Sequence, residues 1–311
     1  MSDGQEQARI DETPALETST AEIAAEEIPP AELPVKKIYP TIKNAVLLCL
    51  LFLGIQLGMS IVFGLLMYYV FSPDSSLLSV ICDLLVYLLS FGLIIWIGFR
   101  KTKKSFNDVF KFKNVSADLW VSAVVLAVGS VIVISELDNL FNYVLPMPEF
   151  FQNIFSSMMA DKPLAMAIIY IGIAPAFMEE FLFRGLILDG FAANYSKRKA
   201  IIISALLFGI IHLNPWQFFT GFLFGIVLAW VCIETKSILL CVFLHFFNNT
   251  LYTLVVRFRD LIPIEGFNVT FEAAKFQPWW FTLSGAALTA LGIWLMMSSI
   301  KRERAIEQEQ S

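Results

Sequence analysis

The segment Leu164–Leu188 reads LAMAIIYIGIAPAFMEEFLFRGLIL, an apolar run that contains two adjacent glutamates and an arginine. A hydrocarbon core of about 30 Å is crossed by about 20 helical residues, so this run is long enough to span a bilayer. Each ionised side chain inside a bilayer costs roughly 2.5–3.5 kcal/mol on insertion scales. The presence of Glu179, Glu180 and Arg184 within one such run therefore needs a physical reason.

Other apolar runs of similar character lie on both sides of this segment. Together they predict an all-α polytopic transmembrane helical bundle of about eight spans. The predicted spans are Ala45–Phe71, Leu77–Phe99, Asp118–Ser135, Leu164–Leu188, Ala200–Leu213, Phe218–Ile233, Ile238–Val256 and Trp279–Ile300. The fifth is short and ends at Asn214-Pro215, because proline stops a helix.

The composition agrees with a membrane protein. The 311 residues are 57% hydrophobic and only 16% charged, and the mean hydropathy is +0.70, whereas soluble domains are roughly 25% charged. The net charge of −5 comes without a basic face, which argues against a nucleic-acid partner. The four cysteines lie in apolar runs without the spacing of metal ligands, so we interpret them as small buried hydrophobic residues.

Basic residues gather in three connecting stretches, Arg100–Lys104, Lys197–Lys199 and Lys301–Arg304. Cytoplasmic loops of membrane proteins carry an excess of Lys and Arg. Eight spans place all three stretches on one side, together with both termini. The sequence therefore predicts that both termini are cytoplasmic.

Within the fourth span, Glu180 and Arg184 are four residues apart with the acid first, the favourable order for a helical ion pair. That pair alone could be purely structural. Glu179 lies about 100° further round the helix and has no partner in its own segment. A carboxylate held out of water beside a cation or an imidazole is a candidate general base.

The only two histidines of the chain lie in other spans, in the patterns Phe208-x-x-x-His212 and His245-x-x-x-Asn249. A single histidine in an apolar helix is commonly a core residue, but here both have polar neighbours. Counting about 1.5 Å per residue from the predicted cytoplasmic ends places these groups and Glu179 in one layer. We therefore expect the active-site helices to enclose a cavity that is open to the cytoplasmic side.

A carboxylate, two imidazoles and an amide suit hydrolysis of a peptide bond. A carboxylate with an imidazole can activate water, and a second imidazole with an amide can donate hydrogen bonds to an oxyanion. The sequence contains no HExxH, Gly-x-Ser-Gly or Gly-x-Gly-Asp motif. Two histidines and a glutamate are also the ligands of some catalytic zinc sites, so zinc-dependent hydrolysis is an alternative.

These motifs resemble those of the CPBP family, the type II CAAX prenyl endopeptidases and their bacterial relatives linked to bacteriocin processing and abortive infection. The family pattern is EExxxR, FxxxH and HxxxN/D on successive helices. The chain carries the three in that order, as Glu179-Glu180-x-x-x-Arg184, Phe208-x-x-x-His212 and His245-x-x-x-Asn249. The resemblance covers roughly Leu164–Val256.

The resemblance implies an intramembrane glutamate-type endopeptidase that uses no cofactor. It further implies that Glu179 and His212 activate the water and that His245 and Asn249 form the oxyanion hole. The supporting residues would be Glu180, Arg184 and Phe208.

The resemblance and the charge pattern also suggest an organisation of the chain. We expect a disordered acidic cytoplasmic tail at 1–40, the first helices and an extracytoplasmic loop at 41–163, a catalytic core at 164–256, and a loop, last span and tail at 257–311. The acidic start has no leader character and the loops are compact, which suggests a bacterial plasma membrane.

The expected partners are the lipid bilayer and a membrane-associated peptide or protein, such as a bacteriocin precursor. Two further functions stay open. The chain could be a non-catalytic membrane scaffold or immunity protein with the same fold. It could also be a transporter that uses Glu179 as a proton site, although no internal repeat supports this.

Overall fold

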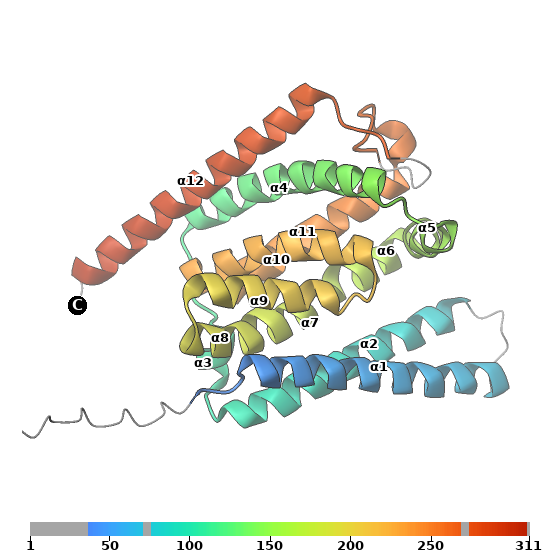
Figure 1. The fold of residues 1–311 in the computed structure, drawn as a ribbon, viewed down its shortest axis with the longest axis horizontal. Coiled ribbons are helices and arrows are strands. Elements are labelled where there is room, and N and C mark those ends of the chain that lie inside the picture. Colours follow the sequence, from blue (N-terminus) through green and yellow to red (C-terminus); the bar gives the residue numbers. More distant parts are fainter. Residues whose placement is uncertain (1–36, 71–75, 269–273, 310–311) are drawn as a thin grey trace, which may run out of the picture. The chain divides into compact units, whose positions relative to one another are not determined.

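The computed structural model describes residues 37–70, 76–268 and 274–309. Residues 1–36, most of the predicted acidic tail, lie outside the described residues. The regular secondary structure of the described residues is helical, apart from one isolated bridge between Phe112 and Ser237. The prediction of an all-α membrane bundle is therefore confirmed, and the helices lie side by side in Figure 1.

Seven helical segments of the described chain are long and apolar enough to cross a membrane. They are α1 (Ile42–Val70), α2 (Ser76–Thr102), α4 (Ala117–Val144), the interrupted segment Leu164–Asn194, α10 (Pro215–Thr235), α11 (Ile238–Arg257) and α12 (Trp279–Glu309). The fifth predicted span corresponds to α9 (Lys197–Ile210), which is 14 residues long and therefore shorter than a bilayer needs. About eight passes remain consistent with this arrangement.

Short helices occupy two connections that the hydropathy pattern did not resolve. They are α3 (Phe106–Phe110) and α5 (Glu149–Ser156), and α5 is followed by the π-helical turn η1 (Ser157–Asp161). A 3₁₀ turn, η4 (Arg259–Leu261), follows α11. The Ser105 hydroxyl accepts a hydrogen bond from the Asp108 amide at 3.2 Å and so caps α3.

The interrupted segment that contains the two glutamates alternates between α and π geometry. It runs through α6 (Leu164–Ala167), η2 (Ile168–Ile173), α7 (Ala174–Glu180), η3 (Phe181–Ile187) and α8 (Leu188–Asn194). Pro175 has no amide hydrogen to donate to the carbonyl of Ile171, four residues earlier. That carbonyl instead accepts a hydrogen bond from the side chain of Asn249 at 3.0 Å, so the irregular backbone binds α11.

The three basic stretches meet at one end of the described helices, as the charge pattern predicted. Asp189 on α8 pairs with Lys104 at 2.6 Å and also with Lys111. Glu234, near the end of α10, pairs with Lys197 and, at 3.0 Å, with Arg304. We call this the basic end; it is where α8 and the last residues of α12 lie in Figure 1.

The last helix packs along α4 through small residues. A Cβ built on Gly292 would lie 2.6 Å from the Leu126 Cα, which leaves no room for a side chain. Small residues allow two helix backbones to approach closely in a membrane. By contrast, nothing lies within 4 Å of a Cβ built on Gly54 of α1.

Replacing Gly292 by alanine should destabilise the protein, because α12 must then move away from α4. We expect a loss of about 1–3 kcal/mol, typical of overpacking, measured as a lower unfolding midpoint in detergent. Gly54→Ala is the matched control and should leave the midpoint unchanged. Equal midpoints for the two variants would contradict the close packing.

Candidate active site

A buried carboxylate, Glu180, joins two neighbouring helices. Its Oε1 accepts hydrogen bonds from Arg184 Nη1 at 2.8 Å and from His245 Nδ1 at 2.7 Å. The relative exposures of Glu180, Arg184 and His245 are 0%, 1% and 3%, so these charges are shielded from water. A buried ion pair needs such additional hydrogen bonds to offset its desolvation. The predicted Glu180–Arg184 pair is thus present, and it also orients an imidazole from α11.

Arg184 extends this cluster to the remaining helices of the core. Its Nη2 donates to the carbonyl of Gly225 on α10 at 3.3 Å. Its guanidinium carbon lies 4.3 Å from the centre of the Phe208 ring on α9, a cation–π distance. The same ring is edge-on to His245, with centres 5.8 Å apart. Arg184 and Phe208 therefore hold together the two elements that carry the histidines, namely α9 with the turn after it and α11.

Glu179 lies beside this cluster and has a partner that the sequence analysis missed. The hydroxyl of Tyr87, on α2, donates a hydrogen bond to Glu179 Oε1 at 2.9 Å. The other oxygen, Oε2, is 3.9 Å from His245 Nε2, too far for a hydrogen bond but close enough for an electrostatic interaction. Glu179 is 7% exposed, so it lies at the edge of the buried cluster.

His212 lies in the turn after α9, and its ring is oriented by its own backbone. Its Nδ1 is 2.9 Å from the Phe208 carbonyl oxygen. Because a carbonyl can only accept, Nδ1 carries the proton, and in the neutral imidazole this leaves the lone pair of Nε2 free. A Cβ on Gly221 would lie 3.7 Å from His212 Cε1, so α10 passes close to the imidazole. His212 is therefore held as a potential base.

Asn249 follows His245 by one turn of α11. Its amide nitrogen donates to the Ile171 carbonyl, and its Oδ1 accepts from Asn248 at 3.0 Å. One amide hydrogen is left over, because the group has two. Among the described residues no hydrogen bond joins His212 or Asn249 to Glu179. The predicted site residues thus form one contacting group, Glu179, Glu180, Arg184, Phe208 and His245. His212 joins this group through Phe208, with ring centres 5.4 Å apart, and Asn249 lies one turn from His245.

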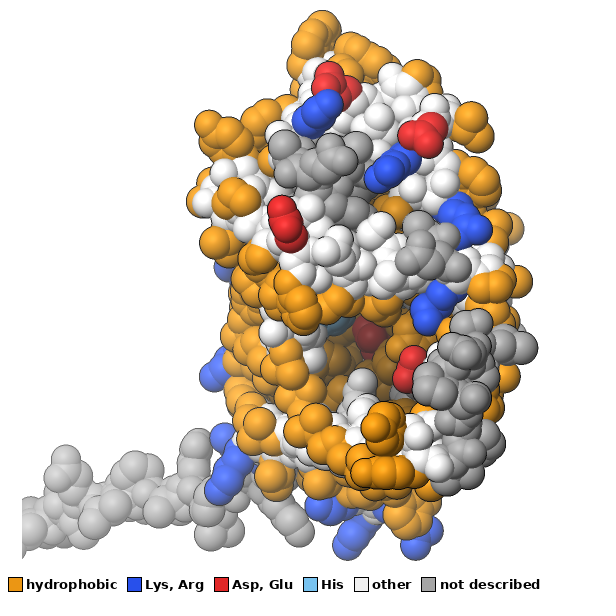
Figure 2. Space-filling model, turned by 90° about the vertical axis from the view of Figure 1, so that its right-hand side faces the viewer, with side chains coloured by type: hydrophobic (Ala, Val, Ile, Leu, Met, Phe, Trp, Pro, Cys, Tyr) orange, Lys and Arg blue, Asp and Glu red, His pale blue; other side chains and the backbone are white. Residues whose placement is uncertain are grey.

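Figure 2 shows a hollow on the face of the molecule that lies on the right of Figure 1, with acidic and histidine side chains deep inside it. The only two histidines of the chain are His212 and His245, so the hollow leads to the candidate site. This face lies at the α5 end, away from the basic end. The structure gives no support to the expected opening toward the basic loops.

No group of three His, Cys, Asp or Glu side chains in the described parts of the chain is arranged to hold a metal ion. Two of the potential donors already have other partners, since Glu180 Oε1 binds Arg184 and His245 Nδ1 binds Glu180. The residues therefore do not fit a preformed metal site, and no chemical step below uses a metal.

These features define a multi-pass membrane protein with a buried site of glutamates, an arginine and histidines. The model of the family described as "Type II CAAX prenyl endopeptidase Rce1-like" matches residues 161–251. The match confirms the resemblance predicted from the motifs, and it supports a peptidase. No curated protein matches the chain significantly. Glu179, His212, His245 and Asn249 lie within the matched segment, whereas Tyr87 lies outside it.

Removing the Arg184 side chain should destabilise the fold strongly. Arg184→Met leaves the Glu180 carboxylate buried beside a single partner, and loss of one member of a buried pair costs about 3–5 kcal/mol. We expect a clearly lower unfolding midpoint in detergent, measured by intrinsic fluorescence. The exposed Arg198 provides the matched control, Arg198→Met, which should behave like the parent protein.

The double variant Glu180→Gln with Arg184→Met removes both charges together. Because no unpaired charge remains, part of the lost stability should return. A double variant less stable than Arg184→Met alone would contradict the pairing.

Proposed function

We propose that the protein is an intramembrane glutamate-type endopeptidase that hydrolyses a peptide bond in a membrane-associated peptide or protein. The observation that carries the proposal is the position of Glu179 beside His245, at the edge of a buried ionic cluster and next to a hollow. The peptidase family match over residues 161–251 supports the same reaction.

In this mechanism Glu179 accepts one proton of a water molecule that enters the site, while the unprotonated Nε2 of His212 accepts a hydrogen bond from the other O–H and helps to activate the water. The activated water attacks the peptide carbonyl, and a tetrahedral oxyanion develops on its oxygen. The cationic form of His245, with Nδ1 bound to Glu180, would donate from Nε2 to this oxyanion, and the free hydrogen of Asn249 would donate as well. The tetrahedral intermediate then collapses, the C–N bond breaks, and Glu179 passes its proton to the leaving amine.

Glu180 and Arg184 are positioning residues in this scheme. Glu180 accepts from His245 Nδ1 and so fixes the orientation of the ring. Arg184 neutralises Glu180, so Glu179 remains the carboxylate available for proton transfer. Low dielectric surroundings strengthen each of these interactions relative to water. We further propose that the protein resides in a bacterial plasma membrane with both termini in the cytoplasm.

Glu179→Gln should abolish cleavage while the protein stays folded. The amide keeps the volume and can still accept from Tyr87, but it cannot accept a proton. A substrate can be found by capturing what copurifies with Glu179→Ala from its own cells, and its cleavage is then followed by mass spectrometry. Loss of a general base lowers rates by about 10²–10⁴-fold. The control is Glu149→Gln, which changes an exposed acid on α5 and should retain full activity. Undiminished cleavage by Glu179→Gln would refute the assignment.

Tyr87→Phe should reduce kcat with little change in KM. The variant removes only the hydrogen bond that holds Glu179 Oε1, and it leaves the ring packed against Phe91, whose centre is 4.7 Å away. A hydrogen bond to a charged group contributes about 1.5–3 kcal/mol, so we expect roughly a tenfold or larger loss in kcat. Tyr170→Phe is a suitable control. A purely structural role would lower the unfolding midpoint and leave kcat of the folded protein unchanged.

The alternatives make different predictions for the same variants. A non-catalytic scaffold would keep its cellular phenotype in Glu179→Gln. A transporter would show a liposome flux that depends on Glu179. A zinc enzyme would lose activity in chelator and regain it with the metal.

A further inference from the structure

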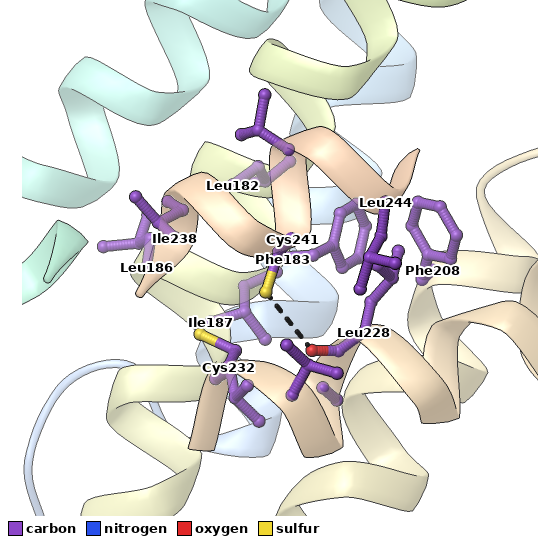
Figure 3. Packing of buried hydrophobic residues seen from close by; sticks show 14 of the residues in the cluster. Leu182, Phe183, Leu186, Ile187, Phe208, Leu228, Cys232, Ile238, Cys241 and Leu244 are labelled. Carbon is purple, nitrogen blue, oxygen red and sulfur yellow. Dashed lines mark hydrogen bonds between the residues drawn. The ribbon is translucent and has the colours of Figure 1, made fainter. Parts of the chain in front are cut away.

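The two ends of the helical core differ in how well they seal the candidate site. Toward the basic end, a layer of apolar side chains from η3, α10 and α11 follows the glutamates. These residues are 0–4% exposed: Leu182, Phe183, Leu186, Ile187, Leu228, Cys232, Ile238, Cys241 and Leu244. Figure 3 shows them packed against one another, with Cys241 donating to the Leu228 carbonyl at 3.4 Å. Water and a peptide have no polar path through this layer.

In the opposite direction, the stretches of α10 and α11 next to the site are only half-buried. On α11 His245 is buried, whereas each residue from 246 to 252 is half-buried, and buried residues return at Thr253. On α10 each residue from 217 to 223 is half-buried, between the buried residues Trp216 and Phe224. The exposed side chain of Asp83 lies one turn before Tyr87 on α2, on the same side of the site. These changes agree with the hollow seen from this end in Figure 2.

The position of Glu179 along its helix agrees with this difference. The interrupted helix continues beyond Leu188 to Asn194, because Asp189 is neutralised by Lys104 and Lys111. Glu179 is therefore fifteen residues from the basic end of this helix, or about 22 Å at 1.5 Å per residue. The buried apolar side chains of Leu182, Phe183, Leu186 and Ile187 lie within this stretch, between Glu179 and the basic end.

We infer that the site is entered from the membrane face opposite the basic loops, and that its substrate is a peptide segment lying on that face. Basic loops are cytoplasmic under the positive-inside rule, so this is the extracytoplasmic face. The substrate class is then a membrane-anchored protein or peptide whose cleaved segment has already left the cytoplasm. The route of entry follows from the packing alone, whereas the nature of the substrate rests on the proposed peptidase function.

Labelling of single cysteines with a membrane-impermeant maleimide tests the route of entry. All variants carry Cys82→Ala, since Cys82 is half-buried and the other three cysteines, Cys49, Cys232 and Cys241, are buried. Asn249→Cys places a thiol in the site and Asp83→Cys places one near the mouth of the hollow. Lys301→Cys, an exposed position at the basic end, is the matched control. Each variant is treated in right-side-out and in inverted membrane vesicles.

Asn249→Cys and Asp83→Cys should react in one vesicle orientation, and Lys301→Cys in the other. The difference between orientations should be roughly tenfold or more, because a thiol reacts as its water-exposed thiolate. Reaction of Asn249→Cys from the same side as Lys301→Cys, or from neither side, would overturn the inference. Labelling does not require cleavage, so this result stands apart from any failure of the proposed peptidase activity.

Discussion

The hydrogen bonds that converge on Glu180 Oε1 are the interaction on which the site depends. An unpaired carboxylate at this depth would be prohibitively costly, and an unpaired guanidinium equally so. Glu180 Oε1 pairs with both Arg184 and His245, and Arg184 also reaches the Gly225 carbonyl and the Phe208 ring. Among the described residues, Glu180 Oε2 and Arg184 Nε are buried without a hydrogen-bond partner. One ionic cluster therefore fixes α7, η3, α9, α10 and α11 relative to one another.

Irregular helix geometry contributes to the same arrangement. Pro175 leaves the Ile171 carbonyl without its usual helical donor, and Asn249 takes that place. Two π-helical turns flank the glutamates, and such turns commonly occur at functional sites. The backbone is thus least regular where side chains from different helices have to meet. Regular structure on both sides keeps these side chains in place.

Much of the site could be predicted because its residues repeat at helical spacing. The Glu180–Arg184 pair and the shared face of His245 and Asn249 follow directly from intervals of four residues. Tyr87 could not be found this way, since it lies 92 residues before Glu179 and its span carries none of the three motifs. The contact depends on how α2 packs against α7, which no local pattern encodes.

The end of the fourth span differs from the prediction, and the reason is electrostatic. The predicted span ends at Leu188, but lysines from the segment after α2 neutralise Asp189, and the helix continues to Asn194. Similarly, the predicted fifth span ends at Leu213, whereas α9 ends at Ile210 and His212 lies in the turn that follows it.

The central claim is that water, activated at Glu179, attacks the peptide bond directly. A single turnover of the captured substrate in water enriched in ¹⁸O tests this most directly, with mass spectrometry of both the product and the protein. The mechanism predicts one ¹⁸O atom in the new carboxyl terminus of the product and none in the protein. Isotope incorporated into the Glu179 side chain would reveal a covalent acyl intermediate and would contradict the mechanism.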